Sequence, residues 1–415
     1  MPLLFLSLFL TIAAVAGIAL SLRQCRHVRA HRATVPAGFA GRISAEEHAK
    51  AADYTCARQS LEIVSQVWGL LVTLGWLFAG ISLLAGLVAH PGLGPILSGA
   101  LLIAALSLCS ALLDLPLAVL RTFRVEARFG FNRMTAGLFL RDQAKGIALN
   151  LVLTFPLVLG LLWLTGTMSG LWWLWAWAGF LVIGAAMMAV YPIWIAPLFN
   201  KFEPLGEGAV SDRVTALLGK AGYRANGLFV MDGSRRSSHA NAYFTGFGRS
   251  KRIVFFDTLL EKLSVDEVEA VLAHELGHFH HRDILRAMAR LALVSLAVFF
   301  WLGVAVKEPW FTVWLGLPQQ DAVAVVVAMI CMEPLGLVAA PLVNALSWQA
   351  EWRADAYAVT LTGGGVHLAS ALVKLSRDSA STLTPDPLYA RFHYSHPPLP
   401  LRLARLPGAD GRAAL

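Results

Sequence analysis

The chain has 415 residues, of which 57% are hydrophobic and only 14% are charged, and its formal net charge at pH 7 is +8. Soluble domains carry about a quarter charged residues, so this composition excludes an ordinary soluble domain and predicts a membrane protein. A nucleic-acid partner is not needed to explain the positive charge, because the basic residues gather in loops beside apolar segments.

Seven apolar runs are long enough to cross a bilayer, which takes roughly 20 residues. We therefore predict an α-helical polytopic membrane protein with seven transmembrane helices. In the first run the positive charges follow the apolar residues instead of preceding them, so we expect a membrane helix and not a signal peptide. The runs span residues 2–22, 63–89, 94–120, 147–167, 170–195, 287–306 and 322–347.

The distribution of basic residues predicts the orientation. Loops 23–62 and 121–146 hold seven and six Lys or Arg residues, whereas the three loops on the other side together hold only Lys307. Loops rich in Lys and Arg stay in the cytoplasm. We therefore predict an N-terminus outside and a C-terminus in the cytoplasm.

The four cysteines form no paired spacing motif. Cys25 and Cys56 fall in a predicted cytoplasmic loop, and Cys109 and Cys331 fall within predicted spans. A reducing compartment and the absence of C-x-x-C predict free thiols, with neither a disulfide nor a Cys-rich zinc site.

Residues 196–286 form the one sizeable block outside the predicted spans. A Pro- and Gly-rich loop leads to a helix expected near 210–221, and "GLFVMDG" then predicts a short strand. Strands are also predicted at 242–245 and 252–256, joined by a Gly/Ser-rich turn. An exposed edge of this strand pair would bind an extended peptide by β-augmentation. Such binding uses the peptide backbone and depends little on the side chains of the peptide.

A helix is predicted to follow these strands. Ser264 and Glu267 have the spacing of a capping box, and apolar residues then recur at helical spacing. Nothing in the pattern ends this helix before residue 287, so we expect it to run directly into the sixth span. Beyond the seventh span, a second helical pattern ends near Gly363 and a polar tail follows.

The stretch "AHELGHFHHRD" (273–283) contains the pattern H-E-x-x-H in His274, Glu275 and His278. Side chains at i and i+4 share one helix face, so two imidazoles so placed reach one zinc ion. Glu275 lies beside that face, where it can take a proton from an attacking water. The alternative is a solvated helix end at the membrane surface.

A catalytic zinc needs a third protein ligand and an open position. Ile284 stands where the metzincin pattern needs a histidine, so Glu351 in "QAEWRADAYA" is the best candidate. Asp355, four residues later, is suited to accept a hydrogen bond from a ligating histidine. The alternative for Glu351 is an ordinary charged residue at the end of a span.

Other polar residues near the membrane are weighed in the same way. His280 and His281 are expected to point off the ligand face and to be solvated or paired with acidic groups. Asp114, Asn150 and Glu333 lie at predicted membrane depth, where they either line a functional space or are protonated or paired between helices. For Glu333, which precedes a proline, capping a broken helix is a further alternative.

Together these motifs resemble the type I CAAX prenyl protease family, integral-membrane zinc endopeptidases of the gluzincin type. The resemblance covers most of the chain in the family's order. It rests on "FGFNRMTAGLFLRDQAKG" (129–146), "IAPLFNKFEPL" (195–205), "SSHANAYFTGFGRSKRIVFFDTLL" (237–260), "AHELGHFHHRD" (273–283), "AEWRADAYA" (350–358) and "YSHPPLPLRLARL" (394–406).

The resemblance implies zinc ligands at His274, His278 and Glu351, with one Zn²⁺ per chain. Glu275 would be the general base, and Asp355 an acidic partner to which a proton-donor role is sometimes assigned. It also implies spans that enclose a water-filled chamber.

Three further residues match the family's substrate-binding positions. Asn241 corresponds to a residue that pairs with the substrate backbone, and His396 and Arg402 to residues that reach the site from the C-terminal tail. The last two are suited to hold a developing oxyanion or the substrate's C-terminal carboxylate. The alternative is a structural role next to Pro-Pro.

The expected organisation follows from the spans and the motifs. We predict an N-terminal membrane region (1–195, five spans), a cytoplasmic α+β zincin-like protease domain (196–286), spans six and seven (287–347) and a C-terminal segment that completes the active site (348–415).

The predicted function is a membrane-embedded zinc metalloendopeptidase, and the resemblance implies prenylated C-terminal CAAX peptides as substrates. The composition, rich in Ala, Leu, Gly and Arg, is typical of high-GC bacteria, where CAAX prenylation is not expected. A quality-control protease for membrane proteins in a bacterial inner membrane is therefore one alternative, and the endoplasmic reticulum would be the location of a eukaryotic chain. A non-enzymatic transporter or scaffold with structural zinc is the alternative of another class.

Overall fold

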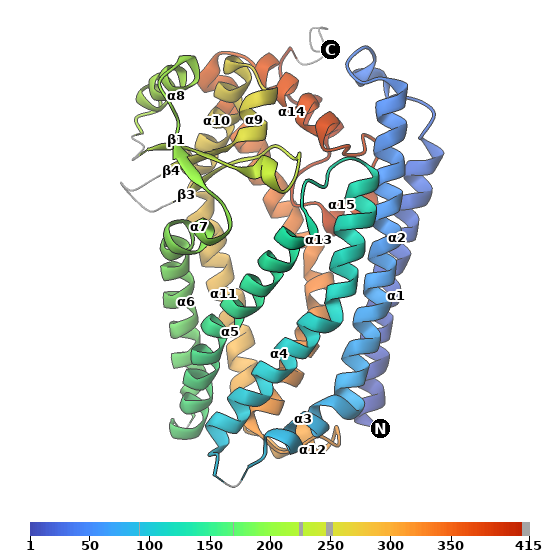
Figure 1. The fold of residues 1–415 in the computed structure, drawn as a ribbon, viewed down its shortest axis with the longest axis vertical. Helices are drawn as coiled ribbons and strands as arrows, with labels where there is room; N and C mark the ends of the chain where they lie inside the picture. Colours follow the sequence, from blue (N-terminus) through green and yellow to red (C-terminus); the bar gives the residue numbers. More distant parts are fainter. Residues whose placement is uncertain (91, 169, 224–226, 246–251, 409–415) are drawn as a thin grey trace.

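The computed structural model describes residues 1–90, 92–168, 170–223, 227–245 and 252–408. Long helices run between the two ends of the molecule, and a small sheet with further helices covers the end opposite the N-terminus (Figure 1). Within the described residues, seven helical segments are long and apolar enough to cross a membrane. The prediction of a seven-span helical membrane protein is therefore confirmed.

Each span agrees with its predicted run to within two residues at one end and extends beyond it by one or more turns at the other. Two are lengthened by π-helical turns, η2 (Trp76–Gly80) and η3 (Leu120–Glu126), and a third by η4 (Tyr191–Ile195). The helices of the bundle are α1 (Pro2–Ala30), α2 (Ala45–Gly75), α3 (Ile81–Val88), α4 (Pro95–Val119), α5 (Ala136–Thr167), α6 (Trp172–Val190), α11 (Asp283–Ala305), the short α12 (Pro309–Val313) and α13 (Asp321–Thr362).

The sheet has four strands in the order β1-β2-β4-β3. The pair β2–β4 is parallel, and β1–β2 and β3–β4 are antiparallel. The strands predicted at 242–245 and 252–256 and in "GLFVMDG" are confirmed, whereas β1 was not expected and the turn 246–251 lies outside the described residues. The bounds are β1 (Phe202–Pro204), β2 (Leu228–Met231), β3 (Ala242–Thr245) and β4 (Arg252–Phe256).

Seven short helices surround the sheet. The helix predicted near 210–221 is present as α8, while the tail that was expected to be merely polar contains α14, α15 and α16. The bounds are α7 (Ala196–Phe199), α8 (Ala209–Lys220), α9 (Asp257–Lys262), α10 (Val265–His280), α14 (Val366–Asp378), α15 (Pro387–His393) and α16 (Leu399–Leu403), with 3-10 turns η1 (Ala37–Phe39) and η5 (Gly233–Arg235).

Two apolar cores lie at opposite ends of the molecule. One joins β4, α8, α10 and α14 at the sheet end, with Phe255 and Leu272 almost completely buried. The other joins α3, α4, α6 and the start of α13, with Ile81 and Val323 completely buried. Helix α13 contributes to both, so it connects the two cores through the bundle.

Helix α10 begins as predicted and ends earlier than predicted. Ser264 and Glu267 form the capping box in both directions. The expectation that this helix continues into the sixth span is wrong, because Arg282 adopts the left-handed conformation (φ 55°) and α11 starts anew at Asp283. Left-handed backbone normally falls on glycine, and the sequence offers no glycine as a signal here.

Helix α13 is longer than the seventh predicted span and has no break. It runs for 42 residues through Pro334 and Pro341 and ends at Gly363, which is left-handed with φ 82°. The helix end predicted near Gly363 is confirmed. Since the helix continues through Pro334, Glu333 caps no helix end.

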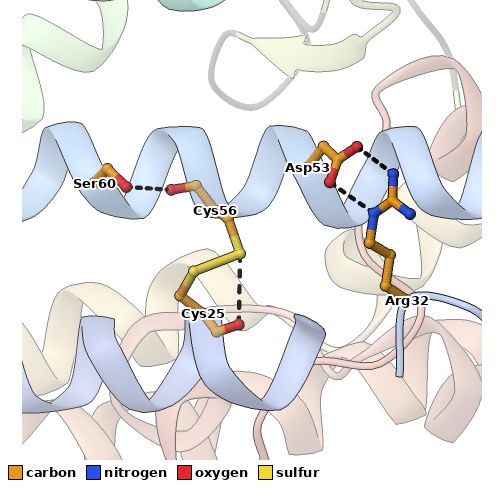
Figure 2. The surroundings of a disulfide bond; sticks show 5 residues. All are labelled: Cys25, Arg32, Asp53, Cys56 and Ser60. Carbon is orange, nitrogen blue, oxygen red and sulfur yellow. Dashed lines mark hydrogen bonds and ion pairs between the residues drawn. A yellow bond between two sulfur atoms is a disulfide. The ribbon is translucent and has the colours of Figure 1, made fainter. Parts of the chain in front are cut away.

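The prediction of free thiols is wrong for two of the four cysteines. Cys25 of α1 and Cys56 of α2 form a disulfide, as Figure 2 shows, with their Cα atoms 5.0 Å apart. The two helices pack against each other and bring together residues that are 31 positions apart in the chain. Cys109 and Cys331 are free, as expected.

Candidate metalloprotease active site

Two helices supply three groups that converge on one point. His274 and His278 lie one turn apart on α10, with ring centroids separated by 4.9 Å. Glu351 of α13 faces both, with Oε2 3.4 Å from His274 Nε2 and Oε1 3.4 Å from His278 Nε2. Ligand atoms of the three residues all lie within 4.8 Å of one another. The structure therefore brings together the three predicted ligands.

The spacing of these atoms suits a single metal ion, because each histidine Nε2 lies 3.4 Å from one oxygen of Glu351. Bonds of about 2.0–2.1 Å in tetrahedral geometry separate ligand atoms by about 3.3–3.4 Å. Glu351 Oε2 is also buried and accepts no hydrogen bond from any described residue. A buried carboxylate oxygen without a hydrogen bond suits a cation, and a donor set of two imidazoles and one carboxylate fits zinc.

A glycine sets the distance between the two helices. A Cβ on Gly277 would lie 2.7 Å from the Cα of Ala354, which is itself completely buried. This close approach lets α10 lie against α13 with both histidines one turn from Glu351. Gly277 was not among the predicted site residues, although it stands inside the H-E-x-x-H pattern.

Each histidine has a carboxylate on its other ring nitrogen. His274 Nδ1 lies 2.8 Å from Asp355, as predicted for that residue, and His278 Nδ1 lies 3.1 Å from Asp283. Such contacts fix the ring orientation and leave Nε2 free for a metal. Asp283, which also accepts a hydrogen bond from Arg353 at 2.9 Å, was missed because an unbroken helix was expected here, and on one helix residues 278 and 283 lie on different faces.

The same carboxylates change the basicity of the imidazoles. Burial by itself would lower the pKa of His278, but the neighbouring Glu351 and Asp283 outweigh it and raise the pKa to about 9. The pKa of His274 is likewise raised, because Asp355 and Glu351 outweigh its burial. Without a metal the His278 ring holds a proton at neutral pH, so metal binding there must release one.

Glu275 follows the first ligand on α10 and is partly exposed. Within the described part of the chain it forms no hydrogen bond or ion pair. Its carboxylate is therefore free to act on a bound molecule.

The C-terminal tail reaches this site. His396 Nε2 lies 3.3 Å from Glu351 Oε1, and its side chain is 63% exposed. Arg402 is buried and bound to Asp355 at 2.5 and 3.0 Å, with Glu351 3.5 Å away. Because Asp355 already occupies its guanidinium, Arg402 is less suited to hold a substrate carboxylate than the sequence suggested.

Comparison with known proteins identifies the family. The model of the CAAX prenyl protease N-terminal region, described as five membrane helices, matches residues 24–201, and the model of peptidase family M48 matches residues 204–410. The chain belongs to peptidase family M48. It is thus a membrane metalloendopeptidase, and this membership argues against a non-enzymatic transporter or scaffold.

Similar proteins extend over nearly the whole chain. CAAX prenyl protease 1 homolog of Arabidopsis thaliana is 32% identical over 97% of this chain and 96% of its own length. CAAX prenyl protease 1 of Saccharomyces cerevisiae is 34% identical over 72% of this chain and 70% of its own. The crystal structure of Ste24p of S. mikatae superposes with a TM-score of 0.91 at 29% identity, covering 97% of this chain and 98% of that one.

Strand β3 of this protease lies at the edge of the sheet. Asn241, which is predicted to bind substrate, directly precedes it. Strand β3 is last in the sheet order and has no strand on its other side within the described residues. Asn241 is exposed, its carbonyl accepts a hydrogen bond from Phe256 at 2.9 Å, and its side chain accepts one from Ala242 at 2.9 Å. An extended peptide could add to this edge.

The remaining polar residues of the protease lie away from the three ligands. His280 is exposed, in line with the expectation of a solvated side chain, and stacks on Tyr357 of α13 with ring centroids 4.6 Å apart. Asp114 and Asn150 line a cavity of about 550 Å³ between the spans, where Asn150 accepts a hydrogen bond from Ser107. Glu333 lines a separate cavity of about 310 Å³.

Proposed function

We propose that this metalloendopeptidase uses one zinc ion held by His274, His278 and Glu351. The observation that carries this proposal is the set of two imidazole nitrogens and one carboxylate whose ligand atoms lie within 4.8 Å of one another. When bound, zinc would supply a Lewis acid that polarises the scissile carbonyl and favours attack by water.

The chain's own residues would then have separate roles. Glu275 would take a proton from the attacking water and pass it to the leaving amine, which requires a carboxylate without another partner. His396, exposed beside Glu351, would donate a hydrogen bond to the developing oxyanion. Asp355 would orient His274, because both of its oxygens are engaged by His274 and Arg402, and a direct proton-donor role is less favoured.

For the substrate we propose CAAX-type, prenylated C-terminal peptides, in line with the names of the relatives. The exposed edge at β3 and Asn241 supports an extended peptide as the bound form. This edge also supports the second candidate, a bacterial quality-control protease with broad substrates, because backbone pairing reads few side chains.

For the orientation we propose that the sheet end of the bundle is cytoplasmic. The basic loops 23–62 and 121–146 support this, since Lys and Arg are retained on the cytoplasmic side. A bacterial inner membrane is the proposed location, and the endoplasmic reticulum the alternative. Substrates would then reach the site from the cytoplasm or from the bilayer.

The test compares wild type with Glu275→Gln on a farnesylated CAAX peptide and on casein, with zinc content measured in both. We expect both proteins to hold zinc and only the wild type to hydrolyse peptide. If both proteins hold zinc and neither hydrolyses either substrate, the zinc-protease proposal is contradicted. Hydrolysis of casein alone would favour quality control over CAAX processing.

The ligand assignment has its own test. Glu351→Ala is expected to lose most of the zinc, and Asp355→Asn to lose less, because only the first removes a donor atom. Full metal content in Glu351→Ala would show that the third ligand lies elsewhere.

A further inference from the structure

Trp348 links the C-terminal tail to the helix that carries Glu351. Its indole Nε1 donates a hydrogen bond to the carbonyl oxygen of Tyr394 at 2.8 Å. Tyr394 is the first residue after α15 and stands two residues before His396. Trp348 lies three residues before Glu351 on α13, so both side chains lie on one face of the helix. One hydrogen bond therefore connects the backbone beside His396 to the helical turn that supplies a candidate ligand.

Residues 394–398 join α15 to α16 and belong to no helix or strand. The side chain of His396 in this segment is 63% exposed, and its Nδ1 pairs with the neighbouring Ser395 Oγ at 2.9 Å. Its Nε2 lies 3.3 Å from Glu351 Oε1. Because neither helix nor sheet hydrogen bonds fix this backbone, the place of His396 at the candidate site depends on the side chains that hold the segment.

Two other side chains hold the chain near this segment, and both act less directly on His396. Asn344 of α13 donates a hydrogen bond at 3.0 Å to the carbonyl of Arg391, five residues before this histidine. Gln24 of α1 donates at 3.4 Å to the hydroxyl of Tyr394 and not to its backbone. The indole bond is therefore the contact of the three that fixes the backbone closest to His396.

A second tryptophan, one turn later on α13, provides a comparison. The rings of Trp348 and Trp352 lie with their centroids 6.3 Å apart. The guanidinium of Arg405 lies 3.7 Å from the centre of the Trp352 ring. The Nε1 of Trp352 is buried without a hydrogen-bond partner among the described residues. The two side chains thus share a helix face and differ in whether the indole N–H is bonded to the tail.

We propose that Trp348 is a positioning residue whose indole N–H holds the tail so that His396 faces the candidate site. Among the described residues no hydrogen bond or ion pair joins Trp348 to the candidate ligands, so it acts through His396 and not on the metal. Without this N–H the Tyr394 carbonyl loses its donor, and the exposed imidazole moves away from Glu351. The inference rests on the proposed protease function, in which His396 donates a hydrogen bond to the developing oxyanion.

The experiment is a double-mutant cycle on the full-length, zinc-loaded protein with wild type, Trp348→Phe, His396→Ala and the double variant. The substrate is whichever of the farnesylated CAAX peptide and casein the wild type cleaves. Trp348→Phe keeps an aromatic ring and should lower kcat about 5-fold, the value of one hydrogen bond, with KM and zinc content unchanged. In the His396→Ala background it should have no further effect, because residues that act together are not additive. Trp352→Phe is the matched control and should keep the wild-type kcat, since its N–H has no partner among the described residues.

Amide hydrogen exchange of the zinc-free protein tests the same contact without catalysis. Residues 390–397 should exchange about 5-fold faster in Trp348→Phe than in wild type or Trp352→Phe. Unchanged exchange in Trp348→Phe would overturn the proposal, and so would an equal loss of kcat from this substitution with and without His396. Because exchange is measured without zinc or substrate, it separates failure of this inference from failure of the proposed protease function.

Discussion

Helix α13 is approached closely by a glycine near each of its ends, and the two contacts differ in kind. Near its start, a Cβ on Gly99 of α4 would meet the Cβ of Ala322 and a methyl of Leu162, each at 2.9 Å. Near its end, a Cβ on Gly277 would meet the backbone of Ala354 at 2.7 Å. At the first contact side chains limit the approach, and at the second the backbone itself does.

The surroundings of the two contacts differ as well. Ala322 lies in the apolar core that closes the bundle, whereas Ala354 lies between Glu351 and Asp355. Methyl groups can shift by a few tenths of an ångström at modest cost, but a helix backbone that carries metal ligands cannot shift without moving them. A close glycine contact with α13 therefore serves packing at one end and sets the spacing of the candidate ligands at the other.

The largest expected effect is that of Gly277→Ala. The added methyl must push α10 away from α13 and so separate His274 and His278 from Glu351. A displacement of about 1 Å can cost about 100-fold in activity, so we expect a loss of that order in kcat/KM together with weaker zinc binding. Near-wild-type zinc affinity in Gly277→Ala would show that the helix contact does not set the ligand distances.

The carboxylates behind the histidines should have the next largest effect. Asp355→Asn and Asp283→Asn are each expected to lower zinc affinity by about 10–100-fold, measured as zinc content after dialysis against graded chelator. Asp355→Asn should be the more severe, because it also leaves the buried Arg402 without its counter-charge. The reverse order would mean that Arg402 is adequately paired by Glu351.

A smaller effect is expected where α10 begins. The buried Glu267 caps this helix and bonds Ser370 at 2.7 Å and Lys374 at 2.8 Å. Burial would raise its carboxyl pKa, but these partners outweigh it and hold the pKa below its ordinary value. Glu267→Gln should lower the free energy of unfolding by about 1 kcal/mol.

The pH dependence of that loss follows from the lowered pKa. The ionised carboxylate stabilises the fold fully above the unfolded-state pKa of about 4.3, and this stabilisation is lost as the pH falls through the lower folded-state value. Thermal unfolding of wild type and Glu267→Gln should therefore differ at pH 7 and converge toward acidic pH. A difference that stays constant from pH 7 down to about pH 3 would rule out the charge as its source.

The smallest effect is expected for Gly99→Ala, the counterpart of the first prediction. Overpacking costs about 1–3 kcal/mol, while replacing glycine by alanine within a helix contributes about 1 kcal/mol. We expect a small decrease in the melting temperature and wild-type zinc affinity. Loss of zinc from this variant would contradict the division between the two ends of α13.

Much of the fold follows from local patterns. The seven spans are predictable because each must present some 20 apolar residues to lipid, and the start of α10 because Ser264 and Glu267 satisfy each other. The early end of α10 was missed, since Arg282 adopts a left-handed conformation without being glycine. The Cys25–Cys56 disulfide was missed because it depends on how α1 packs against α2.

The candidate site divides in the same way. The sequence alone determined the types of the candidate ligands and their order along the chain, because two histidines one turn apart share a helix face whatever surrounds them. Only the tertiary structure decided that Glu351 meets them at 3.4 Å, that Asp283 supports His278, and that Arg402 is already bound by Asp355. Those relations depend on the crossing of α10 and α13 at Gly277 and Ala354, and such contacts between distant segments leave no local pattern in the chain.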